Sequence, residues 1–274
     1  MRGPVGDRST PVRPIVTFIA VASLLAIAFA FATSVTGGPH GPLGAAGFVT
    51  MLIPALSAAI LRAATGEGTR IDWSRLPRRY LPVALFLIPA VMHAAMLPAM
   101  HAAAGRLPWS GHPAWPRVAL NATVGLVVVS AFALFEEIGW RGWLLPRLVD
   151  RLHARLAIVL TAAIWAAWHV PFVVSGILAV SGVSMSHALG IVPLGTFGAG
   201  LIIGWLWLRT ESIWIVALAH GALNDWGQFA FKYMQAAADV NLASVLLAGS
   251  VAVVVTGAVV TATLTPARPE RIAR

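Results

Sequence analysis

Two adjacent glutamates interrupt a long apolar block in a chain that is otherwise poor in acids. Only ten of the 274 residues are Asp or Glu, and Glu136 and Glu137 are two of them. Glu137 and Arg141 are four residues apart, so on a helix they share a face and can form an ion pair. Glu136 points about 100° away from that pair and is not neutralised by it. A carboxylate placed in this way can act as a general base.

Two further apolar blocks carry polar side chains at helical spacing. His169 follows Trp165 by four residues, and Asn224 follows His220 by four, so each pair shares one helix face. Burying these groups separately within a membrane would be expensive, whereas one hydrated cavity would satisfy them together with Glu136. A carboxylate base, imidazoles that titrate near neutrality and an amide donor can activate water and stabilise an oxyanion.

The blocks that carry these residues are long enough to cross a bilayer. The sequence is 58% apolar and 11% charged, whereas a soluble domain is about 45–50% apolar and about 25% charged. A transmembrane helix needs about 20 mostly apolar residues. Eight stretches meet this requirement, at about Ile15–Thr33, Leu43–Leu61, Tyr80–Met100, Val118–Trp140, Ala157–Gly176, Leu189–Leu208, Ile213–Phe231 and Ala243–Leu264. The sequence therefore predicts an all-α, polytopic membrane protein with about eight transmembrane helices. The absence of cysteine excludes a disulfide scaffold and a thiolate metal site.

The positive charge is distributed as in a membrane protein. The net charge is +9, but the basic residues lie at the ends of the apolar blocks and not on one continuous face. All but three of the 19 Lys and Arg residues fall in the termini and alternate connections on one side, the exceptions being Arg106, Arg117 and Lys232. This asymmetry predicts that both termini are cytoplasmic, an N-in/C-in topology in the cell membrane. The predicted partner is the lipid bilayer and not a nucleic acid.

A short amphipathic helix is expected after the fourth stretch. Between Trp143 and Leu156, leucines recur at every fourth position among charged residues, a pattern typical of a helix lying at the membrane interface. Glu136 would then lie near the inner end of its span, with His169 about 18 Å deeper in the fifth stretch.

The polar residues also form a recognisable set of motifs. The CPBP family of intramembrane proteases, which includes the type II CAAX prenyl endopeptidases and bacteriocin-processing or immunity proteins, carries Glu-Glu-x-x-x-Arg, Phe-x-x-x-His and His-x-x-x-Asn on successive apolar helices. This chain resembles that family. Its first motif lies at Glu136, Glu137 and Arg141, and its third at His220 and Asn224.

The second motif departs from the family pattern. Trp165 stands where the family usually has Phe, four residues before His169. The resemblance covers about residues 118–231. It divides the chain into three N-terminal transmembrane helices (1–117), a protease core (118–231), and a C-terminal transmembrane helix with a short cytoplasmic tail (232–274).

The resemblance implies an intramembrane endopeptidase that hydrolyses a peptide bond in a membrane-associated protein or peptide. It implies that Glu136 deprotonates a water molecule that His169 helps to hold. His220 and Asn224 would face the tetrahedral oxyanion.

Further roles implied by the resemblance concern Glu137, Arg141 and a metal. Glu137 and Arg141 would position the end of their helix. The family is described both as metal-dependent and as metal-free, and Glu136, His169 and His220 together are candidate zinc ligands. No His-Glu-x-x-His motif is present, however, and these ligands would come from three helices. We therefore expect no required cofactor, with zinc or another divalent metal as the alternative.

Two other functions are compatible with the same residues. In a transporter or channel, the buried acids and histidines would form a proton or ion relay, although no repeat relates the two halves of the sequence. A non-catalytic immunity or scaffold protein would keep the motifs for binding alone. The sequence specifies neither the substrate nor the oligomeric state.

Overall fold

The protein is an all-α membrane protein. The computed structural model describes residues 12–104, 115–180, 182–228 and 241–264, and these contain helices and turns but no strand. Seven helices in this part are long and apolar enough to cross a membrane. The predicted polytopic all-α fold is confirmed.

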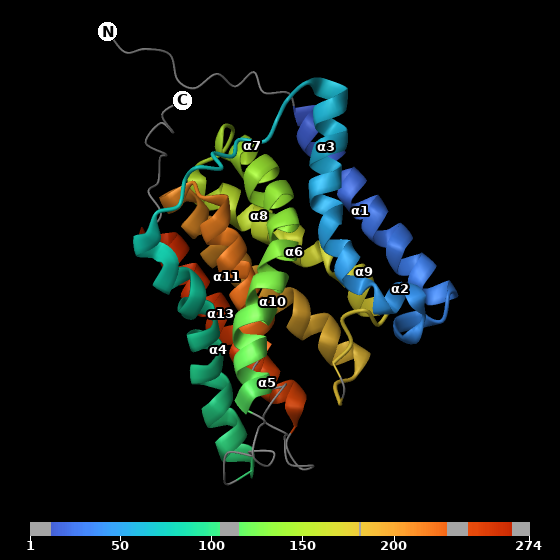
Figure 1. Cartoon of the computed structure of the whole chain (residues 1–274), viewed down its shortest axis with the longest axis vertical. Coiled ribbons are helices and arrows are strands. Elements are labelled where there is room, and N and C mark those ends of the chain that lie inside the picture. Colours follow the sequence, from blue (N-terminus) through green and yellow to red (C-terminus); the bar gives the residue numbers. More distant parts are fainter. Residues whose placement is uncertain (1–11, 105–114, 181, 229–240, 265–274) are drawn as a thin grey trace.

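The helices form a bundle with the polar motifs at its centre. α1 (Val12–Val35) and α3 (Ile53–Thr65) lie on one side, and α4 (Leu81–Ala104) and α13 (Leu242–Leu264) on the other (Figure 1). Between them lie α5 (Trp115–Leu120), α6 (Leu126–Gly139), α7 (Leu145–Val149), α8 (Ala154–Trp168), α9 (Val170–Val174), α10 (Met185–Thr210) and α11 (Ile213–Asp225). α11 packs against α4, α6 and α10, which places it within the bundle.

Seven of the eight predicted stretches correspond to the seven long helices. The remaining one, Ile213–Phe231, forms the 13-residue α11 and a 3₁₀ turn at Trp226–Gln228, while residues 229–231 lie outside the described part. α11 begins where Ser212 Oγ accepts a hydrogen bond from the Ile215 amide and caps its first turn. The described part of this stretch is therefore a short, buried helix.

The predicted end of the fourth stretch and the predicted interfacial helix are both wrong. Trp115–Val149 forms one long helical run of 35 residues that includes α5, α6, α7 and two π-helical segments. Residues 140–149 are all buried. The charge pattern was misleading because Arg147 is buried: its guanidinium lies 3.9 Å from the centre of the Trp143 ring and donates to Glu67.

This longer helix places Glu136 and His169 at similar depth. The run ends at Val149 and α8 begins at Ala154, after a short turn. Counting from that turn at 1.5 Å per residue, Glu136 lies about 20 Å along its helix and His169 about 22 Å along α8. The difference in depth expected from the sequence does not occur.

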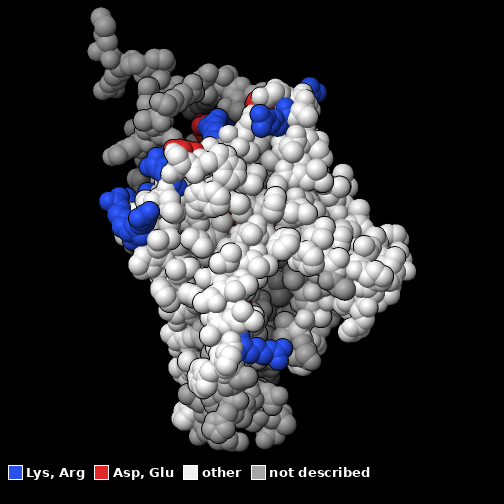
Figure 2. All heavy atoms as spheres, viewed as in Figure 1, with Lys and Arg blue, Asp and Glu red and all other residues white. Residues whose placement is uncertain are grey.

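The segment that joins α3 to α4 is fastened to the same end of the bundle. Arg147 donates hydrogen bonds to the Glu67 carboxylate and to the Gly68 carbonyl, and the Arg70 amide donates to Gly142 O at 2.9 Å. Lys and Arg side chains gather at this end (Figure 2). The N-in/C-in topology predicted from this asymmetry stays a prediction.

Small residues allow the central helices to approach closely. A Cβ atom at Gly221 on α11 would lie 2.8 Å from both Cα and Cβ of Ser130 on α6, too close for real contacts. The two helix backbones therefore meet at this point, which lies one residue from His220. Close packing of this kind through small residues is common between membrane helices.

We expect Gly221→Ala to lower the free energy of unfolding by about 1–3 kcal/mol, because the added methyl group forces α6 and α11 apart. Thermal unfolding in detergent measures the change. Gly190→Ala on α10 is the matched control, since nothing lies within 4 Å of a Cβ atom there. Equal stability of the two variants would contradict the close contact.

Candidate active site

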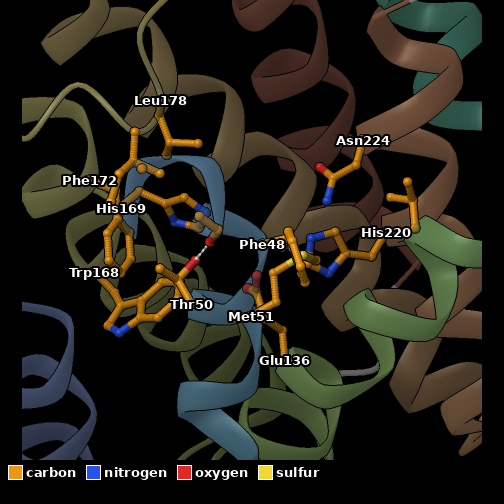
Figure 3. Close-up of a pocket in the computed structure, with 14 residues that line it drawn as sticks. Phe48, Thr50, Met51, Glu136, Trp168, His169, Phe172, Leu178, His220 and Asn224 are labelled. Atoms are coloured by element: carbon orange, nitrogen blue, oxygen red, sulfur yellow. Dashed lines mark hydrogen bonds between the residues drawn. The ribbon is translucent and has the colours of Figure 1, made fainter. Parts of the chain in front are cut away.

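Four of the six predicted site residues line one cavity. The cavity has a volume of about 360 Å³, and Glu136, His169, His220 and Asn224 all contribute to its wall. Figure 3 shows the Glu136 carboxylate between His169 on one side and His220 with Asn224 on the other. Glu137 and Arg141, which complete the six, are buried behind this wall.

The two oxygens of the Glu136 carboxylate have different surroundings. Oε2 accepts a hydrogen bond of 2.7 Å from the indole nitrogen of Trp165. Oε1 makes no hydrogen bond with any residue in the described part of the chain. The side chain is 3% exposed, so its open oxygen faces the cavity and not bulk solvent.

The ring of His169 is oriented by the backbone of its own helix. Its Nδ1 lies 2.8 Å from the carbonyl oxygen of Trp165. Because a carbonyl can only accept, Nδ1 carries the hydrogen and Nε2 of the neutral ring keeps its lone pair. The His169 amide bonds to the Ala166 carbonyl three residues back, where α8 ends ahead of Pro171.

Glu137 is the acceptor for two cationic or potentially cationic side chains. Its Oε1 accepts from Arg141 at 2.9 Å, as the four-residue spacing predicts, and lies 2.8 Å from His220 Nδ1. All three side chains are at most 2% exposed. The carboxylate is the acceptor, so Nδ1 of His220 carries a hydrogen and donates it. Nε2, the other ring nitrogen, takes no part in this hydrogen bond.

Arg141 connects this pair to two further helices. Its second terminal nitrogen donates to the Gly200 carbonyl on α10 at 3.3 Å. Its guanidinium carbon lies 4.6 Å from the centre of the Trp165 ring on α8, within the range of a cation–π contact. The ion pair between Glu137 on α6 and Arg141 in the π-helical segment Trp140–Leu144 thereby connects this helical run to α8, α10 and α11.

The candidate metal ligands do not form a metal site in this structure. Within the described residues, no three His, Asp or Glu side chains are grouped so that they could hold a metal ion. Hydrogen bonds to protein atoms occupy Nδ1 of His169, Nδ1 of His220 and Oε2 of Glu136, so Nε2 of each histidine and Oε1 of Glu136 are the atoms left as possible ligands.

A comparison with protein families agrees with this geometry. Residues 118–226 match the model of the family described as type II CAAX prenyl endopeptidase Rce1-like. This segment, which is less than half of the chain, is similar to the Rce1-like family. The resemblance to the CPBP family is thereby confirmed, and all six predicted site residues lie inside the matched range. No curated protein matches the sequence.

Part of the cavity wall lies outside the Rce1-like segment. Gly44 in α2 (Pro42–Ala45), and Gly47, Phe48, Thr50 and Met51 in the 3₁₀ segment Gly47–Leu52, all line the cavity. The sequence analysis missed them because apolar and small side chains in an apolar helix carry no local sign of a site. Residues 44–51, which precede the Rce1-like segment, therefore form part of the cavity wall.

The sequence analysis also missed the hydrogen bond from Trp165. The sequence shows only that Trp165 stands where the family usually has Phe. The only available signal was chemical: Trp carries an N–H donor and Phe does not.

We expect Arg141→Met to destabilise the protein by about 3–5 kcal/mol, because it leaves the Glu137 carboxylate buried without its cation. The double variant Glu137→Gln/Arg141→Met removes both charges and should recover part of that loss. Unfolding in detergent compares the two. A double variant that is no more stable than Arg141→Met would show that the buried charge is not the cause.

Proposed function

We propose that this protein is an intramembrane endopeptidase of the CAAX-protease type, which uses Glu136 to activate water. Its substrate is a membrane-associated protein or peptide. The observation that carries the proposal is the half-open Glu136 carboxylate, which faces the same cavity as His169, His220 and Asn224. The match of this segment to a family of endopeptidases supports it.

The cavity provides the groups for the first step of hydrolysis. A water molecule beside Oε1 of Glu136 loses a proton to that oxygen while its own oxygen bonds to the carbonyl carbon of the substrate. Nε2 of His169 accepts a hydrogen bond from the other O–H of the same water and so orients it; that hydrogen stays on the water oxygen. Protonated Glu136 then returns the proton to the amine nitrogen as the C–N bond breaks.

His220 and Asn224 are suited to stabilise the oxyanion. The Asn224 amide makes no hydrogen bond with the described residues, so its N–H groups are available to the cavity. His220 can donate from Nε2 only when both ring nitrogens carry hydrogen, because Nδ1 is bound to Glu137. Donors held at fixed positions in a dry site are the most effective form of oxyanion stabilisation.

The membrane provides the setting for this reaction. The long apolar helices make the protein a multi-pass membrane protein. We propose that it resides in the cell membrane with both termini in the cytoplasm, as the basic end in Figure 2 suggests. Its cavity walls then select substrates that are themselves held at the bilayer.

We expect Glu136→Gln to reduce the rate of peptide cleavage by about 10²–10⁴, because the amide cannot accept the proton from water. The assay uses purified protein in lipid nanodiscs with fluorogenic peptides, each offered with and without a prenyl group. Glu211→Gln is the control for loss of a carboxylate, since Glu211 pairs with Arg75 at the surface. Full activity of Glu136→Gln would refute Glu136 as the base.

The same preparation separates the alternative functions. In proteoliposomes, ion or proton flux that depends on Glu136, without peptide cleavage, would identify a transporter or channel. Protein that produces neither cleavage nor flux would fit a non-catalytic binding role.

We propose that the reaction needs no cofactor. Treatment with EDTA is then expected to leave the rate of cleavage unchanged, because every proton transfer described above uses a side chain of the chain itself. Activity that is lost with EDTA and regained with zinc would contradict this proposal.

A further inference from the structure

Trp165 contacts most of the residues in the candidate site without lining the cavity itself. Its indole N–H donates to Glu136 Oε2 at 2.7 Å, and its backbone carbonyl accepts from His169 Nδ1 at 2.8 Å. Its ring edge meets the His220 ring with centroids 4.9 Å apart and planes at 76°. One residue on α8 is therefore in direct contact with side chains from α6 and α11.

The indole has little freedom to move. Trp165 is 1% exposed, and the Arg141 guanidinium covers one part of its ring at 4.6 Å. On α10, a Cβ atom at Gly200 would lie 3.3 Å from Cε3 of Trp165 and 2.8 Å from the Ala162 side chain. Because Gly200 has no side chain, α10 leaves space for the indole ring of Trp165.

The hydrogen bond depends on the indole nitrogen and not on the aromatic ring. Phenylalanine at this position would keep the stacking beneath Arg141 and the edge contact with His220, but it has no donor. Glu136 Oε2 would then be a buried carboxylate oxygen without a hydrogen bond, and the carboxylate would be free to rotate.

We propose that Trp165 is a positioning residue that holds Glu136 by Oε2 and so presents Oε1 to the cavity. The inference rests on the function proposed above. A carboxylate held by one oxygen has one productive orientation toward the water that it activates. Because Trp165 does not line the cavity, its loss should act on the chemical step and leave substrate binding nearly unchanged.

The kinetic test is Trp165→Phe, assayed on the peptide that the wild-type protein cleaves. We expect kcat to fall by about 10–100-fold, the usual effect of losing a hydrogen bond to a charged group, while KM changes less than about twofold. Trp205→Phe on α10 is the matched control, because its buried indole nitrogen has no hydrogen-bond partner among the described residues. Unchanged kcat in Trp165→Phe, or an equal loss in Trp205→Phe, would overturn the proposal.

If Trp165→Phe does not fold, a side chain of nearly the same shape as tryptophan provides the test. A tryptophan analogue with sulfur in place of the indole N–H keeps both rings and removes only the donor. The same fall in kcat at unchanged KM is expected from this analogue at position 165. Wild-type kcat with the analogue would overturn the proposal.

A second measurement is independent of catalysis. In protein labelled with ¹⁵N-tryptophan, the indole N–H resonance of Trp165 is identified by its loss in Trp165→Phe. Glu136→Ala should shift this resonance, whereas Glu211→Ala should not. A resonance that does not move would refute the hydrogen bond. If no peptide is cleaved at all, the function proposed above fails while this spectrum still decides the role of Trp165.

Discussion

The structure depends on one buried carboxylate, that of Glu137. One oxygen of this group accepts hydrogen bonds from Arg141, on the same helical run, and from His220 on α11. Arg141 also donates to the Gly200 carbonyl on α10. A charge at this depth is tolerated only with such partners, since an unpaired one costs several kcal/mol or more. The helices that carry the partners must therefore meet at this point, and the close contact of Gly221 with Ser130 allows them to do so.

Pairing Glu137 in this way leaves Glu136 available for chemistry. The two neighbours on α6 face in different directions: one is committed to the ion pair, and the other is held by the Trp165 indole and open on its second oxygen. The same buried cluster therefore combines an ion pair with a carboxylate that keeps one oxygen free of hydrogen bonds to the described residues. His220 belongs to both, because it contacts Glu137 through one ring nitrogen and lines the cavity with Glu136.

The cavity is closed by parts of the chain that carry no polar motif. Phe48 and Met51, which precede α3, and Leu178, which follows α9, line the cavity together with the candidate site residues (Figure 3). This apolar lining keeps the electrostatic interactions inside the cavity strong. It also forms an apolar wall on a side of the cavity that the matched family segment does not supply.

The helical class, the stretches that form the long helices and the grouping of Glu136, His169, His220 and Asn224 were all predictable from the sequence. Each follows from local rules, namely the length of apolar blocks, the four-residue spacing on a helix and the cost of isolated polar groups in lipid. Three features were not predictable: the burial of Arg147 against Trp143, the continuation of the fourth helix to Val149, and the hydrogen bond from the Trp165 indole to Glu136. These features depend on contacts between residues far apart in the chain, such as Arg147 with Glu67. The spacing of residues within one helix does not predict such contacts.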